Sequence, residues 1–181
     1  MALHGGIEET TFEIAQDAAE RAGASLYAVV QPDNLTWHVP SHRYDPAESE
    51  KLTAFLDHVE VAVSVHGYGG VPDHESRWLT IAIGGGGRAH AAVVGAALRS
   101  HLADYEVIDD IEAVPRQYRG LHPANPVNLV RTAGVQVELP PRVRGQSPVW
   151  ADHDFNAAPF TPHTAALIDA LAAVAEPLGS F

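Results

Sequence analysis

The hydrophobic and polar positions along the chain follow two different periods, one helical and one extended. Apolar residues recur every three or four positions over residues 10–22, which predicts an amphipathic helix. Thr10 and Glu13 have the spacing of a capping box, and Gly23 follows the last periodic position, so we expect the helix to begin and end there. Similar patterns predict three more helices: one opened by Asp45 and Pro46 and running to about His58, one over Arg88–Leu102, and one over Thr164–Ala175.

Short apolar runs between glycine and other turn residues predict strands. Five such runs are present: Ser25–Val30, Val61–Val65, Leu79–Ile83, Tyr105–Ile108 and Val135–Leu139. Because strands alternate with helices, we expect an α/β fold whose mixed, largely parallel sheet is flanked by helices. We expect residues 1–181 to form a single domain, in which residues 140–162 are irregular and residues 146–181 supply a surface wrap and the last helix.

Composition narrows the functional classes. A chain of 181 residues with 46% hydrophobic residues is long enough to bury one core. It has no cysteine, which excludes disulfides and thiolate ligands, so a bound metal would depend on histidine and carboxylate. We find neither an apolar stretch long enough for a membrane span nor a secretory leader, and expect a soluble, cytoplasmic protein.

The formal charge of −12 argues against binding to nucleic acids or to membrane surfaces, because their phosphates would repel the chain. The charge is uneven, however, since five arginines lie in one stretch that contains a single acid, Glu138. This stretch is either an anion receptor or a set of arginines paired with acids elsewhere. The five arginines are Arg116, Arg119, Arg131, Arg142 and Arg144.

Polar residues with catalytic chemistry occur inside the predicted strands or directly after them. Ligands of open α/β sheets bind at the carboxyl ends of strands, and a glycine after His4 and after His66 lets the backbone turn there. The four segments are His4-Gly5-Gly6-Ile7-Glu8, His38-Val39-Pro40-Ser41-His42, His66-Gly67-Tyr68-Gly69-Gly70 and Gln136-Val137-Glu138.

His4, Glu8 and His66 have the chemistry of a catalytic zinc site, which commonly uses two histidines and one carboxylate. The alternative for each histidine is an ordinary surface or hydrogen-bonded core residue. For Glu8 the alternative is an acid that complements the dipole of the following helix.

Glu138 lies in the run VQVEL, where Val135, Val137 and Leu139 face one side of a strand and Gln136 and Glu138 the other. Periodicity leaves two interpretations open. Glu138 is either a solvated residue on a half-exposed strand or a general base beside a metal.

Six motifs, taken in order, resemble those of the bacterial and phage poly-γ-glutamate hydrolase family, whose members are compact relatives of zinc carboxypeptidases. The resemblance covers about residues 2–145, and the ordered set is far more specific than any one motif. The motifs are HGGIE, HVPSHRYDP, SVHGYGG, GGGG before a helix, NPVNLVR and GVQVELPPRVR.

The resemblance implies a carboxypeptidase-like fold, zinc ligands at His4, Glu8 and His66, and a catalytic role for Glu138. Glu13 stays a second candidate for the carboxylate ligand, because the family usually has one more residue between the first histidine and the glutamate. Family members also carry a strand and more chain before that histidine, so either the assigned start is late or the strand in residues 1–3 is minimal. The resemblance further implies catalytic roles for Arg142 or Arg144, and substrate binding by His38, Asn125, Asn128 and Arg131.

These observations together predict a zinc-dependent amidohydrolase that acts on γ-linked glutamyl amide bonds of an anionic polymer or peptide. Zinc would polarise the carbonyl, Glu138 would carry the proton, and an arginine would hold a substrate carboxylate or the oxyanion. Two alternatives stay open. One is the same chemistry on a γ-glutamyl link of peptidoglycan or on an N-acyl amino acid, and the other is a metal-binding module without turnover.

Overall fold

A four-stranded sheet in the order β1-β4-β2-β3 forms the centre of the computed structural model, which describes residues 1–35, 37–69 and 78–179. β4 runs parallel to β1 and antiparallel to β2, and β3 runs parallel to β2, so the sheet is mixed, as predicted. Gly70, the last residue of the SVHGYGG motif, lies outside the described residues. The strands are β1 (Val63–Gly67), β2 (Thr80–Gly84), β3 (Glu106–Ile108) and β4 (Val135–Leu139).

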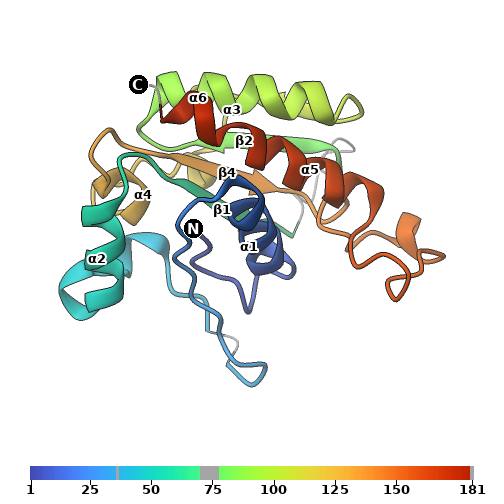
Figure 1. Cartoon of the computed structure of the whole chain (residues 1–181), viewed down its shortest axis with the longest axis horizontal. Coiled ribbons are helices and arrows are strands. Elements are labelled where there is room, and N and C mark those ends of the chain that lie inside the picture. The colour runs from blue at the N-terminus through green and yellow to red at the C-terminus, as the bar shows by residue number, and fades with distance from the viewer. Residues whose placement is uncertain (36, 70–77, 180–181) are drawn as a thin grey trace.

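One face of the sheet is covered by helices. α1, α3 and α5 enclose the main hydrophobic core with that face, and α3, α5 and α6 run along the upper side of the sheet in Figure 1. α2 and α4 lie on the left of the view. The helices are α1 (Thr11–Ala22), α2 (Glu50–His58), α3 (Arg88–His101), α4 (Pro126–Leu129), α5 (Pro162–Ala173) and α6 (Ala175–Leu178). Single 3₁₀ turns are η1 (Ser41–Arg43), η2 (Pro46–Glu48), η4 (Arg116–Tyr118) and η5 (Pro148–Trp150).

The other face of the sheet is polar. Side chains alternate along a strand, so Val135, Val137 and Leu139 enter the core while Gln136 and Glu138 project to the opposite side. β1 contributes polar residues to the same side, because Ser64 pairs in register with Gln136 and His66 with Glu138. The sheet therefore separates an apolar core from a row of buried polar side chains.

The predicted strand over Ser25–Val30 is wrong. Those residues form only one isolated bridge, in which Ala28 pairs with Ala2. Residues 1–3 lie between this segment and β1, since Met1 O accepts a hydrogen bond from Val65 N. Among the described residues, the segment before His4 thus pairs with residues 25–30 only at the bridge between Ala2 and Ala28.

The helices differ from their predicted beginnings. Thr10 adopts a left-handed conformation with φ 69° and its side chain makes no capping bond, so the predicted capping box is absent. The hydroxyl of Thr10 accepts a hydrogen bond from Gln146 instead. The helix predicted after Asp45 is divided, because Asp45 caps the turn η2 and Ser49 caps α2 separately.

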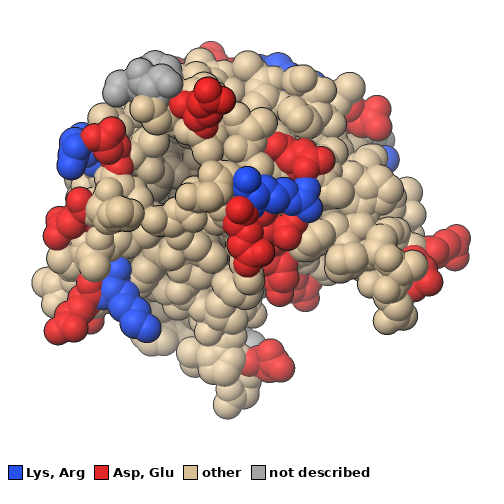
Figure 2. Space-filling view, in the orientation of Figure 1, with Lys and Arg blue, Asp and Glu red and all other residues tan. Residues whose placement is uncertain are grey.

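The C-terminal segment is irregular up to α5, as expected for residues 140–162, apart from the turn η5. Thr161 caps α5, so this helix begins before the predicted position at Thr164. No helix within the described ranges combines the length and apolar character that a membrane span requires. Figure 2 shows one face of the molecule, where most of the visible Lys and Arg side chains lie beside Asp or Glu.

Candidate metal centre and cleft

The first histidine and the first site glutamate are joined by one tight turn. The carbonyl of His4 accepts hydrogen bonds from the backbone N–H of Ile7, at 3.0 Å, and of Glu8, at 2.8 Å. Gly6 is required at the centre of this turn, because a Cβ there would lie 2.1 Å from the carbonyl oxygen of Gln31. The turn thereby returns Glu8 to the side of His4, directly before α1 begins.

His4, Glu8 and His66 converge on one point. The Nδ1 atoms of the two histidines are 3.1 Å apart. Glu8 Oε1 lies 2.9 Å from His4 Nδ1, and Glu8 Oε2 lies 3.3 Å from His66 Nδ1. One donor atom from each residue fits within a separation of 4.8 Å, so the structure brings the three predicted ligands together. The second candidate, Glu13, lies exposed on α1.

Hydrogen bonds from outside the cluster fix the orientation of each donor. His4 Nε2 lies 2.8 Å from the carbonyl oxygen of Val39, and His66 Nε2 lies 2.8 Å from Ser64 Oγ. The backbone N–H of Gly67 donates to Glu8 Oε2 at 3.0 Å. Such outer contacts leave both Nδ1 atoms facing inward, as is usual for metal-ligating histidines. Two imidazoles and one carboxylate in this arrangement fit a zinc ion with an open coordination position.

The same contacts set the ionisation of Glu8 and His66. Burial alone would raise the pKa of Glu8, but hydrogen bonds with His4 and His66 hold it well below its usual range. Burial opposes protonation of His66, whereas the hydrogen bond with Glu8 and the charge of Glu138 raise the pKa of His66 overall. The carboxylate is therefore ionised and ready to ligate a cation at neutral pH.

Glu138 is buried beside this cluster with 6% of its surface exposed, so the half-exposed alternative does not hold. Burial raises the pKa of Glu138 to about 7, and the negative charge of Glu8 adds to this effect, while His66 and a hydrogen bond from Gln136 oppose it. That bond joins Gln136 Nε2 to Glu138 Oε1 at 2.7 Å, and Asn125 Nδ2 in turn donates to Gln136 Oε1 at 2.9 Å. A chain of buried amides thus holds one oxygen of Glu138.

The cluster and Glu138 lie at the base of a polar cleft with a volume of about 580 Å³. One wall comes from the segment after His38, including Ser41 and His42, and the other from residues 116–122. The two walls meet where the rings of His42 and His122 approach to 4.5 Å. The candidate metal ligands and Glu138 therefore line the same cleft.

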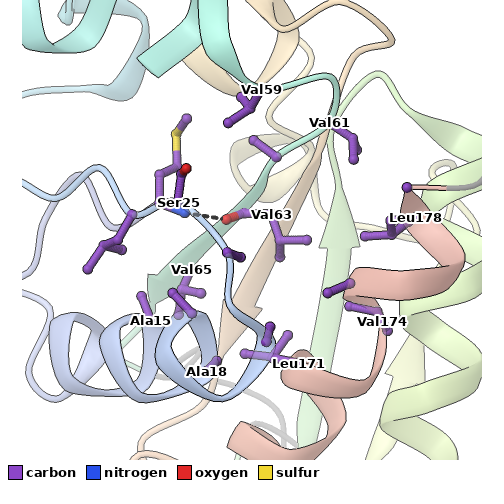
Figure 3. A pocket seen from close by; sticks show the side chains of 18 of the residues that line it. Ala15, Ala18, Ser25, Val59, Val61, Val63, Val65, Leu171, Val174 and Leu178 are labelled. Atoms are coloured by element: carbon purple, nitrogen blue, oxygen red, sulfur yellow. Dashed lines mark hydrogen bonds between the residues drawn. The ribbon is translucent and has the colours of Figure 1, made fainter. Parts of the chain in front are cut away.

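A second pocket, of about 340 Å³, lies on the helix side of the sheet between α1, β1 and the last two helices. Figure 3 shows its lining of small apolar side chains, among them Ala15, Val63 and Leu171. None of its described lining residues belongs to the candidate metal cluster. Of these two pockets of the described chain, the polar cleft is the one that contains the candidate metal ligands.

Comparison with known proteins identifies the family. A sequence profile for poly-gamma-glutamate hydrolase matches residues 1–154, most of the chain. The chain belongs to the poly-gamma-glutamate hydrolase family. A search of curated protein sequences found no match.

Two solved structures resemble the fold of this family member. A bacteriophage poly-gamma-glutamate hydrolase superposes with a TM-score of 0.74 at 22% identity, covering 99% of this chain and 84% of the phage chain. A protein named "YNDL-apo (Zinc-free)" superposes with a TM-score of 0.62 at 26% identity, covering 79% of this chain and 66% of the other. The phage enzyme supports the α/β fold class predicted from the family resemblance.

Of three polar residues that the family resemblance places at the site, His38 and Asn125 line the cleft and Asn128 lies behind its wall. His38 stacks on His4 with ring centroids 4.2 Å apart, and its Nε2 lies 3.4 Å from Glu8 Oε1. Asn125 lines the cleft, but its side-chain nitrogen donates hydrogen bonds to Gln136 Oε1 and to the carbonyl of Gly120. Asn128 stands behind the wall and holds the carbonyls of Gly120 and His122.

Three arginines that the same resemblance implies do not line the cleft. Arg131 is exposed and pairs with Glu60. Arg142 has a buried Nε that makes no hydrogen bond with any described residue. Arg144 is buried and donates to three backbone carbonyls, those of Leu139, Glu9 and Tyr68. The structure therefore gives Arg144 a role in holding the backbone beneath the metal cluster.

Sequence reasoning missed Ser64 as the partner of His66 and Gln136 as the partner of Glu138. Alternation along β1 and β4 carries the signal for both, because each lies two residues before the group it contacts and on the same face. It also gave no individual role to Arg116, which lines the cleft. Nothing in the local pattern distinguishes Arg116 from the other arginines of its stretch.

Proposed function

We propose that this protein is a zinc-dependent amidohydrolase that cleaves γ-glutamyl amide bonds in an anionic polymer or peptide. The observation that carries the proposal is the convergence of His4, Glu8 and His66 beside the buried carboxyl of Glu138. Membership of the poly-gamma-glutamate hydrolase family supports the substrate class. The name of the "Zinc-free" structural relative supports the choice of metal.

His4 Nδ1, His66 Nδ1 and a Glu8 oxygen would hold the zinc ion in this proposal. When bound there, zinc polarises the scissile carbonyl and increases the acidity of water. The ring orientation needed for this comes from Val39 O and Ser64 Oγ, which occupy the outer nitrogens. The chain itself therefore contributes a preformed set of donors.

Glu138 serves as the general base and acid. Its Oε1 accepts a hydrogen bond from Gln136, and Oε2 accepts none from the described residues, which leaves Oε2 to take a proton from the attacking water. The same carboxyl then protonates the leaving amine. A pKa of about 7 suits both directions of transfer near neutral pH.

In this proposal the remaining predicted site residues either support the groups that bind zinc and line the cleft or have no role in the reaction. His38 covers His4 and Glu8 at the mouth of the cleft. Asn125 and Asn128 position the wall formed by residues 116–122. Arg144 supports the turn that carries Glu8, while Arg131 and Arg142 take no part in binding or chemistry.

The test combines elemental analysis with hydrolysis of defined amides. We expect about one zinc per chain and cleavage of a γ-linked glutamate oligomer, with little cleavage of the α-linked oligomer of the same length. Peptidoglycan fragments and N-acyl amino acids serve as competing substrates. Preferential cleavage of either would show that the substrate is not a γ-linked glutamate polymer. Bound zinc without any amide hydrolysis would show that the protein is a metal-binding module.

A further inference from the structure

The wall of the cleft formed by residues 116–122, here named the wall loop, is held rigidly from behind. Asn128 Nδ2 donates to Gly120 O at 2.7 Å and to His122 O at 3.0 Å. Asn125 Nδ2 reaches the same Gly120 carbonyl at 3.2 Å. The backbone N–H of Gly85, directly after β2, donates to Arg119 O at 2.8 Å. These contacts anchor the backbone from Arg119 to His122, and the N–H of Arg119 donates in turn to Arg116 O at 3.4 Å.

Arg116 is the first residue of the wall loop and is exposed at the cleft. Among the described residues that line the cleft, it is the single lysine or arginine. Its guanidinium makes no hydrogen bond or ion pair with any described residue. Arg116 is therefore a cation that faces the site and is available to a ligand.

The other arginines of the basic stretch are already engaged or lie elsewhere. Arg119 pairs with Glu112 and donates to two backbone carbonyls, of Val114 and Glu112. Arg131 forms an ion pair with Glu60, and the guanidinium of Arg144 donates hydrogen bonds to three backbone carbonyls. Arg142 does not line the cleft, so of the five arginines Arg116 is the one whose guanidinium lines the cleft and is not already held by described residues.

An anionic substrate needs such a group. The protein has a net charge of −12, and two carboxyl groups, Glu8 and Glu138, lie at the base of the cleft. A carboxylate entering the cleft meets repulsion unless a cation offsets it. A guanidinium binds a carboxylate through two parallel hydrogen bonds, so it selects the planar anion as well as its charge.

We propose that Arg116 is the carboxylate-recognition residue of the cleft and that it selects amide substrates carrying a free carboxylate near the scissile bond. This inference rests on the proposed function for the nature of the substrate. It assigns recognition to the wall loop and separates it from the metal cluster, which lies at the base of the cleft.

The experiment measures binding instead of turnover. A γ-linked glutamate tetramer and the same tetramer with its carboxylates converted to carboxamides are titrated calorimetrically into the zinc-loaded Glu138→Gln protein. Arg116→Ala in this background is expected to weaken binding of the carboxylate tetramer by about tenfold or more, as for the loss of a charge-assisted hydrogen bond. Binding of the carboxamide tetramer is expected to change by less than about twofold, because it offers no carboxylate.

Arg131→Ala is the matched control, since it removes the same charge from an exposed arginine outside the cleft. It should leave both affinities within about twofold. Arg116→Lys should restore part of the affinity, because lysine keeps the charge without the bidentate geometry. Equal losses on both tetramers, an unchanged carboxylate affinity in Arg116→Ala, or equal effects of Arg116→Ala and Arg131→Ala would each overturn the assignment.

The outcome for Arg116 is separable from that of the proposed function. Hydrolysis is measured in parallel on the zinc-loaded protein with its native Glu138. If the protein hydrolyses no amide but still binds the carboxylate tetramer selectively through Arg116, the proposed function is refuted and the role of Arg116 in carboxylate recognition stands. Hydrolysis with binding that ignores Arg116 would do the reverse.

Discussion

His66 and Glu138 face the same side of the sheet because they occupy paired positions in the adjacent parallel strands β1 and β4. The spacing between β1 and β4 therefore sets the distance between His66 of the metal cluster and the carboxyl group of Glu138. Their strand neighbours Ser64 and Gln136 are paired in the same way and contact them along each strand. Each functional group therefore has its orienting partner two residues earlier on the same strand.

Substitution of His66 by Ala should remove most bound zinc, since it deletes one of three donors and leaves a buried His4–Glu8 pair. Zinc content is measured by elemental analysis after dialysis against buffer without metal. Glu13→Ala is the control, because Glu13 is exposed on α1, and it should retain full zinc. Full zinc in His66→Ala, or loss in Glu13→Ala, would contradict the ligand set.

Glu138→Gln should lower kcat by about two to four orders of magnitude, the usual contribution of a general acid–base group. The amide preserves the shape of the side chain but cannot accept the proton. Zinc content, melting temperature and kcat are measured on one preparation. A folded, zinc-loaded variant that keeps more than about a tenth of the original kcat would exclude Glu138 as the base.

The metal-free protein should show an effect of Glu138 on stability that depends on pH. Its folded pKa is about 7, above the ordinary value of 4.5, so the folded state binds more protons than the unfolded state between these values. Stability contributed by this group is therefore present at low pH and lost as pH rises toward and through 7. The penalty at pH 8 is on the order of 3 kcal/mol.

Glu138→Gln removes that titration. The metal-free variant should gain thermal stability over the unsubstituted protein as pH rises from 5 to 8, with the difference between their melting temperatures widening across this range. Melting is followed by circular dichroism in the presence of a chelator. A difference that stays constant from pH 5 to pH 8 would show that Glu138 is not buried as a neutral acid.

Gln136→Leu should shift the acid limb of the kcat/KM profile to higher pH. The hydrogen bond from Gln136 lowers the pKa of Glu138, so its removal raises that pKa, and a higher pH is needed to form the carboxylate. Activity should fall far more at pH 6 than at pH 9. Gln117→Leu is the matched control in the cleft wall, and an equal loss at every pH would assign Gln136 a purely structural role.

Gly6→Ala should destabilise the protein by roughly 3 kcal/mol or more, because its Cβ would lie 2.1 Å from the backbone oxygen of Gln31 and 2.4 Å from the backbone nitrogen of the same residue. For a chain of this length the melting temperature should fall by about 6 °C or more. Gly69→Ala is the comparison, since a Cβ there meets no atom of the described residues within 4 Å, and it should melt near the original temperature. Equal melting temperatures for the two variants would contradict the packing of the His4–Glu8 turn.

The sequence predicts the elements that the core stabilises. β4 and α1 follow their patterns closely because the apolar residues of both elements belong to the main hydrophobic core. The run at residues 25–30 has the same apolar character but, among the described residues, pairs only at the bridge between Ala28 and Ala2, which a local pattern does not reveal. Whether such a run becomes a strand depends on a partner elsewhere in the tertiary structure.

The residues of the candidate site likewise fall into two groups, those that the sequence predicts and those that it does not. His4 and His66 are predictable because glycines follow them, and Glu8 because the turn returns it. The arginines are not, since sequence gives their charge but not their partners, and the partners decide which one remains available. Arg116 and Arg144 lie in one basic stretch, yet one faces the cleft and the other is buried under three carbonyls.

The strict alternation of β4 makes this strand intolerant of insertion or deletion. A shift of one residue in its pairing with β1 and β2 would turn Val137 into the cleft and place Glu138 in the apolar core. Stability and chemistry would fail together, because the same five residues carry both. Variation in substrate preference within this scaffold is therefore expected to arise by changes of length and composition in the two cleft walls, while the spacing of β4 stays constant.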